Sequence, residues 1–159
     1  MLCDQHIVVC SKEAVQMMST VHQRLVPHFV MADLYKPTHD NHPCTQWVSH
    51  SAKHYAWLSL HTGEMFREYT RRFGKRHKSQ NMFERVSDVP YALADKTLFF
   101  EPPQVMPAQY RVEGDAVAAY RRYYIAEKLA FARWFHSEPP YWCAQEYERS
   151  RHGLPPATL

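Results

Sequence analysis

The sequence predicts an all-α protein, a compact single-domain helical bundle with a long proline-containing irregular connection. Apolar residues recur at helical spacing in several stretches, and no stretch shows the alternation that is typical of a β-strand. Prolines cluster between the expected helices rather than within them. The chain has 159 residues, which suffices for one core. We expect one helical domain over residues 1–143 and a polar C-terminal tail over 144–159.

The first two thirds of the chain predict three helices. Residues 11–25 carry one apolar stripe, and Ser11 is a plausible N-cap. A linker rich in Pro, Asp and Asn follows over 33–43. Beyond it we expect consecutive helices over about 43–50 and 51–73, the second capped by Ser51 and ended by Gly74.

The last third predicts an irregular segment followed by one long helix. Residues 88–114 contain four prolines, so we expect an ordered but irregular crossing. A helix over about 115–136 follows, with Asp115 as its N-cap and Pro139 and Pro140 beyond its end. The tail from about Ala144 is polar and is expected to fray.

Composition excludes several classes of protein. Aromatic residues make up 14% of the chain, and disordered proteins are poor in them. No apolar run approaches the roughly 18 residues of a membrane span, and no signal peptide is visible, so we expect a soluble cytoplasmic protein. The four cysteines are expected to be reduced thiols. Only 4 glycines are present, and no P-loop, dinucleotide loop or Gly-x-Ser-x-Gly motif occurs.

Positive charge is concentrated in one short stretch. Residues 67–78 hold six Lys and Arg against one acid, Glu68, whereas the whole chain carries only +3. Clustered cations at a helix end favour binding of phosphate or nucleic acid, and a solvated helix end is the alternative. The candidate contacts to a DNA backbone are Arg67, Arg71, Arg72, Lys75, Arg76, His77 and Lys78.

Candidate catalytic residues come from polar helix faces and from the linker. Glu13 and Glu68 could act as general bases near cations, although a surface ion pair is the alternative for each. His42 belongs to the His39-Asp40-Asn41-His42-Pro43-Cys44 cluster. We therefore name Glu13, His42 and Glu68 as candidate catalytic residues. Gln16, His39 and Trp47 are further candidates for substrate contact, although tryptophans at helical spacing more often belong to the core.

A zinc site is an alternative use of the same linker. His39, His42 and Cys44 could supply three ligands, with Cys3 or His6 as a fourth, and His50 and His54 form a second pair one turn apart. Structural zinc sites usually show two paired motifs, and only one local cluster occurs here. We assign no metal and no cofactor.

Several segments resemble a group of small, mostly uncharacterised bacteriophage proteins. The shared patterns are a Cys-Asp-x-His helix start, a Thr-His-x-Asn-His-Pro-Cys linker and a Glu-Tyr-x-x-Arg-Phe-Gly-Lys-x-His-Lys helix end. The segments that carry them, over about residues 2–142, are CDQHIVVCSKEAVQMMSTVH, LYKPTHDNHPCTQWVSHSAKHYAWL, EYTRRFGKRHKS, AYRRYYIAEKLAFARW and PPYW. This group is remotely similar to the pyrimidine-dimer DNA glycosylases of the endonuclease V type.

The resemblance implies an activity and a site. Those glycosylases are all-α proteins that flip a base, attack the sugar with an amine and use a glutamate to assist. The likeness implies Glu13 as that glutamate and the basic helix end as a clamp on the DNA backbone. The glycosylases attack with the amine of a threonine in second position; here that residue is Leu2, so Met1 or Lys12 would supply the amine.

We therefore expect an enzyme that acts on DNA bases in a phage-infected cell, most simply a glycosylase/lyase on damaged or modified pyrimidines. Three alternatives stay open. They are a base-hypermodifying transferase, a non-enzymatic DNA-binding or host-takeover protein, and a small enzyme that binds a nucleotide or phosphate at His39, His42 and the basic helix end. The sequence predicts no oligomeric state.

Overall fold

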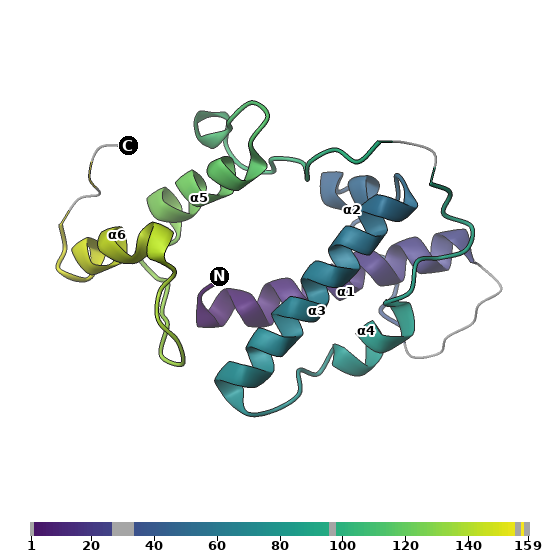
Figure 1. Cartoon of the computed structure of the whole chain (residues 1–159), viewed down its shortest axis with the longest axis horizontal. Coiled ribbons are helices and arrows are strands. Elements are labelled where there is room, and N and C mark those ends of the chain that lie inside the picture. The colour runs from purple at the N-terminus through teal and green to yellow at the C-terminus, as the bar shows by residue number, and fades with distance from the viewer. Residues whose placement is uncertain (1, 27–33, 96–97, 155–156, 158–159) are drawn as a thin grey trace. The chain divides into compact units, whose positions relative to one another are not determined.

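The computed structural model describes residues 2–26, 34–95, 98–154 and 157, and within these ranges it is all-helical with no strand (Figure 1). This confirms the predicted fold class. The elements are α1 (Asp4–Leu25), α2 (Pro43–Val48), α3 (Ala52–Phe73), α4 (Gln80–Val86), the 3-10 helix η1 (Ala108–Tyr110), α5 (Ala116–Glu127) and α6 (Tyr141–Arg151).

The chain divides into two compact units. One comprises Ile7–Phe100, and the other comprises the residues up to His6 together with those from Glu101 onward. The first unit therefore holds most of α1 and all of α2, α3 and α4. That all of 1–143 forms a single domain stays a prediction.

The two helices expected after the linker are confirmed almost to the residue. Residues 34–42 are irregular, whereas Asp33 of the predicted linker lies outside the described residues. Ser51 is the N-cap of α3, and Gly74 ends it with φ +63° while its N–H donates to the Thr70 carbonyl. Glycine is favoured at this left-handed position, because it has no Cβ that would clash with the backbone.

Helix α1 begins about two turns earlier than predicted. It starts at Asp4 rather than at Ser11, whose hydroxyl instead donates to the Ile7 carbonyl at 2.6 Å inside the helix. Hydrogen bonds to residues far along the chain stabilise this early start of the helix. The Asp4 N–H donates to the Arg133 carbonyl at 2.9 Å, and the Asp4 carboxylate accepts from the Phe135 N–H at 2.7 Å.

The C-terminal third differs most from the prediction. Helix α5 ends at Glu127 rather than near residue 136, and the expected polar tail is helical through Arg151. The physical reason is a small core in this unit, because apolar residues from the turn after α5 pack with α6 and the N-terminus. Its buried members are Cys3, Leu129, Ala132, Trp134, Cys143 and Tyr147. The expectation that the residues from Ala144 fray is therefore wrong for residues 144–151.

The Ile7–Phe100 unit is built on α1 and α3. His22, near the end of α1, lies 3.0 Å from the Tyr55 hydroxyl at the start of α3. His77, just beyond α3, donates from Nε2 to the carbonyl of Val8 near the start of α1, at 3.1 Å. The two helices therefore run in opposite directions, and their facing sides supply the core of this unit. Its buried members include Val15, Met18, Val21, Leu58, Met65 and Phe66.

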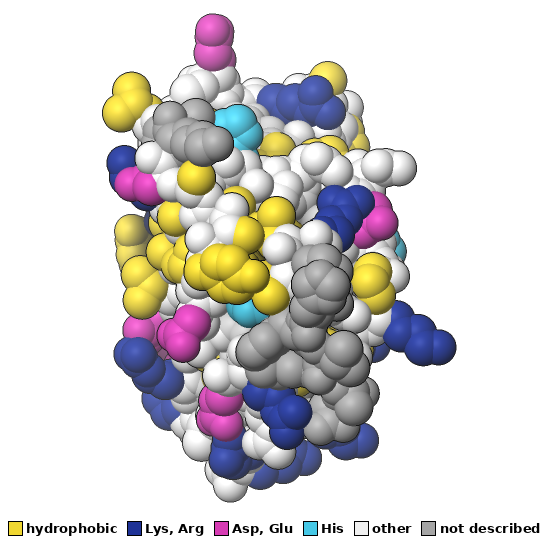
Figure 2. All heavy atoms as spheres, turned by 90° about the vertical axis from the view of Figure 1, so that its right-hand side faces the viewer, with side chains coloured by type: hydrophobic (Ala, Val, Ile, Leu, Met, Phe, Trp, Pro, Cys, Tyr) yellow, Lys and Arg dark blue, Asp and Glu magenta, His cyan; other side chains and the backbone are white. Residues whose placement is uncertain are grey.

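The proline-containing segment is irregular, as predicted. Over its described residues, 88–95 and 98–114, it contains only the short η1. Figure 2 shows the face that lies at the right of Figure 1, where residues 88–95 run, and hydrophobic side chains gather in its middle. Val89 and Tyr91 of this stretch are exposed. No helix in the described part of the chain is long and apolar enough to cross a membrane.

Two buried histidines each accept a hydrogen bond at one ring nitrogen, so both rings are neutral. His54 Nε2 accepts from the Phe100 N–H at 3.3 Å, so its proton lies on Nδ1, 2.7 Å from the Ser51 hydroxyl. His77 Nδ1 accepts from the Ser79 N–H at 3.0 Å. Burial lowers the pKa of both imidazoles below the ordinary 6.5.

We predict that stability falls as the pH is lowered below about 6.5. The folded pKa of His54 and of His77 lies below the unfolded value, so the unfolded chain binds more protons in acid and gains population. Thermal melting between about pH 7.5 and 5 measures the effect, and each kcal/mol by which stability falls lowers Tm by about 2–4 °C. The variant His54→Gln, which cannot titrate, should show a shallower decline. An unchanged Tm across this range would contradict the prediction.

Candidate nucleic-acid interface

Five exposed cations surround the C-terminal end of α3; we call them the cationic end. Three of them are engaged in ion pairs with glutamates, namely Arg67 with Glu64 at 2.5 Å, Arg71 with Glu68 at 2.7 Å and Arg76 with Glu84 at 2.6 Å. Lys75 and Lys78 are exposed and form no ion pair within the described ranges. Exposed ion pairs are weak, roughly 0–1 kcal/mol, so a phosphate can compete for the three arginines.

Two predicted DNA contacts are instead structural. The Arg72 side chain has 0% exposure, and its Nε donates to Glu68 at 2.7 Å. The His77 ring is buried between hydrogen bonds to Val8 and Ser79. Arg72 is turned by about 100° around the helix from the exposed Arg71, and this turn places it on the buried side of α3. The burial of both side chains corrects the expectation that they contact phosphate.

Glu68 organises two arginines. Its carboxylate accepts two hydrogen bonds from Arg71 and one from Arg72, each at 2.7 Å. The bonds from Arg71, aided by Arg72 and opposed by burial, lower the pKa of Glu68 from 4.5 to about 2. So acidic a group is a weak proton acceptor at neutral pH. Its geometry suits a positioning role better than the predicted role of general base.

Glu13 lies near the middle of α1. It follows Val8 by five residues of α1, about 7.5 Å along the axis at 1.5 Å per residue, and Val8 is bonded to His77. Its carboxylate is exposed and forms no hydrogen bond or ion pair with any residue that the structure describes. Gln16, on the next turn, is partly buried, and its carbonyl accepts from the Thr20 hydroxyl at 2.9 Å.

His39 and His42 lie at the opposite end of α3. The Thr20 hydroxyl donates to the Thr38 carbonyl at 3.1 Å, and Arg24 pairs with Asp40 at 3.1 Å, so the linker follows the last turns of α1. Those turns lie level with the start of α3, where α2 also packs (Figure 1). Since α3 has 22 residues, about 33 Å separate its ends.

The linker histidines have local structural roles. His39 adopts φ +55° and its carbonyl accepts from the His42 N–H at 2.9 Å. His42 caps α2, since its Nδ1 accepts from the Cys44 N–H at 3.2 Å. The structure therefore does not bring His39 and His42 together with the basic helix end, and the prediction of a nucleotide site shared by them is wrong. Nor does the described part of the chain bring three His, Cys, Asp or Glu side chains together as a metal site would need.

Trp47 belongs to the core rather than to the substrate contacts. It is 5% exposed, and its Nε1 donates to the Phe100 carbonyl at 3.0 Å. Its ring forms T-shaped contacts with the rings of His54 and Trp57. This corrects its assignment as a substrate contact.

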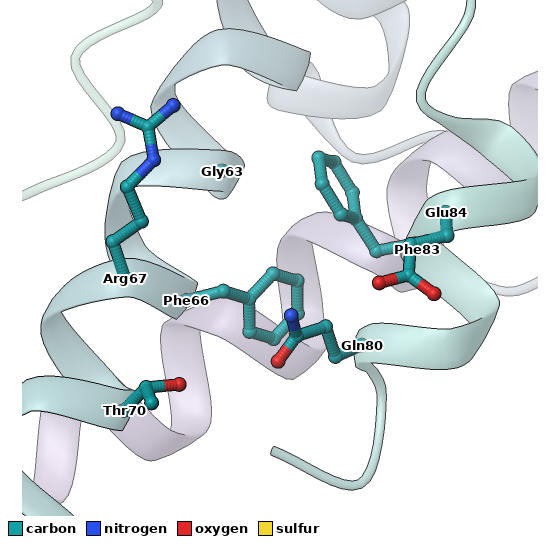
Figure 3. A pocket seen from close by; sticks show the side chains of 7 residues that line it. All are labelled: Gly63, Phe66, Arg67, Thr70, Gln80, Phe83 and Glu84. Atoms are coloured by element: carbon teal, nitrogen blue, oxygen red, sulfur yellow. The ribbon is translucent and has the colours of Figure 1, made fainter. Parts of the chain in front are cut away.

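A hollow that the sequence did not reveal lies between α3 and α4, with a volume of about 430 Å³. Figure 3 shows the rings of Phe66 and Phe83 and the amide of Gln80 between the two helices, with Arg67 and Thr70 along α3. The phenyl centroids are 5.2 Å apart, and Gln80 Oε1 has no hydrogen-bond partner among the described residues. This arrangement offers aromatic walls and an amide beside the cationic end. Sequence reasoning missed it because α4 was not expected.

No curated protein and no solved structure matches this chain. Residues 1–82, just over half of the chain, match the family described as pyrimidine dimer DNA glycosylase. The matched region contains α1, α2 and α3, and with them Glu13 and the cationic end. The chain therefore belongs to the pyrimidine dimer DNA glycosylase family.

Proposed function

We propose that this protein is a DNA glycosylase that binds duplex DNA through the cationic end and releases damaged or modified pyrimidines, with Glu13 assisting. The observation that carries the proposal is that Glu13, exposed and about 7.5 Å along α1 from the Val8–His77 contact, lies with five exposed cations within the region that matches the family. Phosphates would occupy Lys75 and Lys78 directly and displace glutamates from Arg67, Arg71 and Arg76.

The chemistry requires a nucleophile and a stabilised sugar. An amine or a water molecule forms a bond to C1′ while the glycosidic C–N bond breaks, and the base leaves with the electron pair and takes up a proton. A carboxylate beside C1′ stabilises the positive charge that develops on the sugar. Lys12, adjacent to Glu13 on α1 and exposed, is a candidate amine. The other candidate, the Met1 amine, lies outside the described residues.

Glu68 and His42 have different tasks in this proposal. Glu68 holds Arg71 and Arg72, so it is a positioning residue for the cationic end. His42 caps α2. Its linker contacts α1 at Thr20 and Arg24, about 10–16 Å along that helix from Glu13. One of the three candidate catalytic residues, Glu13, thus keeps a direct role.

A non-enzymatic DNA-binding protein is the second candidate function. It is favoured by the same geometry, because Glu68 and His42 are occupied in structural contacts and leave only Glu13 of the three candidate residues for catalysis. A base-hypermodifying transferase remains an alternative of the same substrate class. It would add mass to the DNA base, whereas a glycosylase removes the base.

We predict that Glu13→Gln abolishes base release and leaves DNA binding and Tm unchanged. The amide keeps the shape of the side chain but removes the negative charge that stabilises the developing cation. The assay is strand cleavage of ultraviolet-irradiated duplex DNA, with borohydride trapping to detect an amine adduct. Glu138→Gln is the matched control, since Glu138 is also exposed and has no partner in the described ranges.

If the wild-type chain binds DNA but releases no base and yields no adduct, the non-enzymatic alternative replaces the glycosylase. A modified base of increased mass would instead support the transferase. Base release by Glu13→Gln at the wild-type rate would remove Glu13 from the mechanism.

We predict that Lys75→Glu weakens binding to duplex DNA and makes it less dependent on salt. Removing one cation that neutralises a phosphate should reduce the slope of log K against log salt by about 0.9. The matched control is Lys36→Glu, which changes the net charge equally at an exposed linker position. Fluorescence anisotropy over a salt series measures both variants. Equal reductions in the two would show that net charge alone, and not the cationic end, determines binding.

A further inference from the structure

A second surface of the Ile7–Phe100 unit carries exposed aromatic rings. Trp57 is 39% exposed, and the exposed His61 lies one turn further along α3. The two rings are stacked, with centroids 5.1 Å apart and planes at 15°. The edge-on ring of Trp47, 5.4 Å away, supports Trp57 from the core side. The pair is therefore held in place while part of its surface faces solvent.

Two phenylalanines extend this surface. Phe99 and Phe100 are 43% and 47% exposed, although the chain folds them onto buried residues. Phe99 stacks on the fully buried His54 with centroids 5.1 Å apart, and the Phe100 carbonyl accepts from the Trp47 indole. We call Trp57, His61, Phe99 and Phe100 the aromatic platform. Trp57, Phe99 and Phe100 rest on Trp47 and His54, which are anchored by hydrogen bonds, and His61 stacks on Trp57.

The platform and the cationic end share a face of α3. Arg71 follows Trp57 by fourteen residues, close to four helical turns, so both point to the same side about 21 Å apart. The acids between them are neutralised, because Glu64 pairs with Arg67 and Glu68 pairs with Arg71 and Arg72. A nucleic-acid strand can therefore run along this face without repulsion from uncompensated carboxylates.

We propose that the aromatic platform stacks on unpaired bases of a DNA strand whose phosphates reach the cationic end. This inference rests on the proposed binding of DNA. Exposed aromatic rings beside a cationic track bind single strands irrespective of sequence, since every base has a π-face. A purely apolar protein partner would find less complementarity on a face that continues into Arg67, Arg71 and Lys75.

The test measures the affinity for a labelled oligothymidine single strand and for a fully paired duplex of equal length. We expect Trp57→Ala to weaken single-strand binding about tenfold, which corresponds to about 1.4 kcal/mol, with duplex binding changed less than about twofold. Trp57→Phe, which retains a ring, should recover most of the affinity. Fluorescence anisotropy at fixed salt gives all of these affinities.

Leu60→Ala is the matched control. Leu60 lies on the same helix and is 73% exposed but carries no ring, so its truncation should leave single-strand binding unchanged. An equal decrease in Leu60→Ala and Trp57→Ala, or no decrease in Trp57→Ala, would overturn the stacking platform. The first of these outcomes would indicate a general apolar docking surface.

Two further measurements keep the test decisive. If melting shows that Trp57→Ala is unfolded, His61→Ala and Trp57→Phe replace it, because both leave an aromatic ring at position 57 against Trp47. A decrease in single-strand affinity in His61→Ala no larger than in Leu60→Ala would then reject the platform, whereas Trp57→Phe is expected to bind almost as tightly as wild type. Base release from irradiated duplex DNA is measured in parallel, so an inactive enzyme with an intact platform is distinguished from an active enzyme without one.

Discussion

The antiparallel pairing of α1 with α3 is the constraint on which the rest of the Ile7–Phe100 unit depends. Hydrogen bonds hold each end of the pair. At one end the Tyr55 hydroxyl donates to the Val86 carbonyl at 2.6 Å and lies 3.0 Å from His22, and at the other His77 donates to Val8. These buried polar links fix the register of two long helices, since a shift by one turn would leave each group unsatisfied. That register places Glu13 about 7.5 Å along α1 from the Val8–His77 contact, which adjoins the cationic end.

Some basic residues near the end of α3 are buried, whereas others remain at the surface. Arg72 and His77 belong to the densest stretch of positive charge in the chain, yet both are buried and hydrogen-bonded. Their removal from the surface leaves five exposed cations, of which three are held by glutamates in weak ion pairs. Pre-positioned arginines give up less side-chain freedom on binding a phosphate than free ones do. The acids of α3 thus orient the cationic end without blocking it.

The aromatic residues likewise lie partly in the core and partly at the surface. Trp47 and Tyr55 fill the core and are tied by hydrogen bonds to the carbonyls of Phe100 and Val86. Trp57, Phe99 and Phe100 stay partly exposed over that core. An aromatic-rich composition therefore serves both the packing of short helices and a surface that suits nucleobases. The family match over residues 1–82 includes Trp47, Tyr55 and Trp57.

The sequence by itself determined the helical class, the bounds of α2 and α3, the irregular proline segment and the concentration of charge at residues 67–78. These depend on local physics: apolar spacing, a capping Ser51, a left-handed Gly74 and ring-constrained prolines. Tertiary structure decided where α1 begins, where α5 ends and that α6 forms, because contacts such as Asp4 with Phe135 and Cys3 with the Trp134 core join residues far apart in the chain. It also decided which cations of the run reach solvent. The spacing within α3 does not show which side of the helix is buried, because that side is known only once α1 is packed against α3.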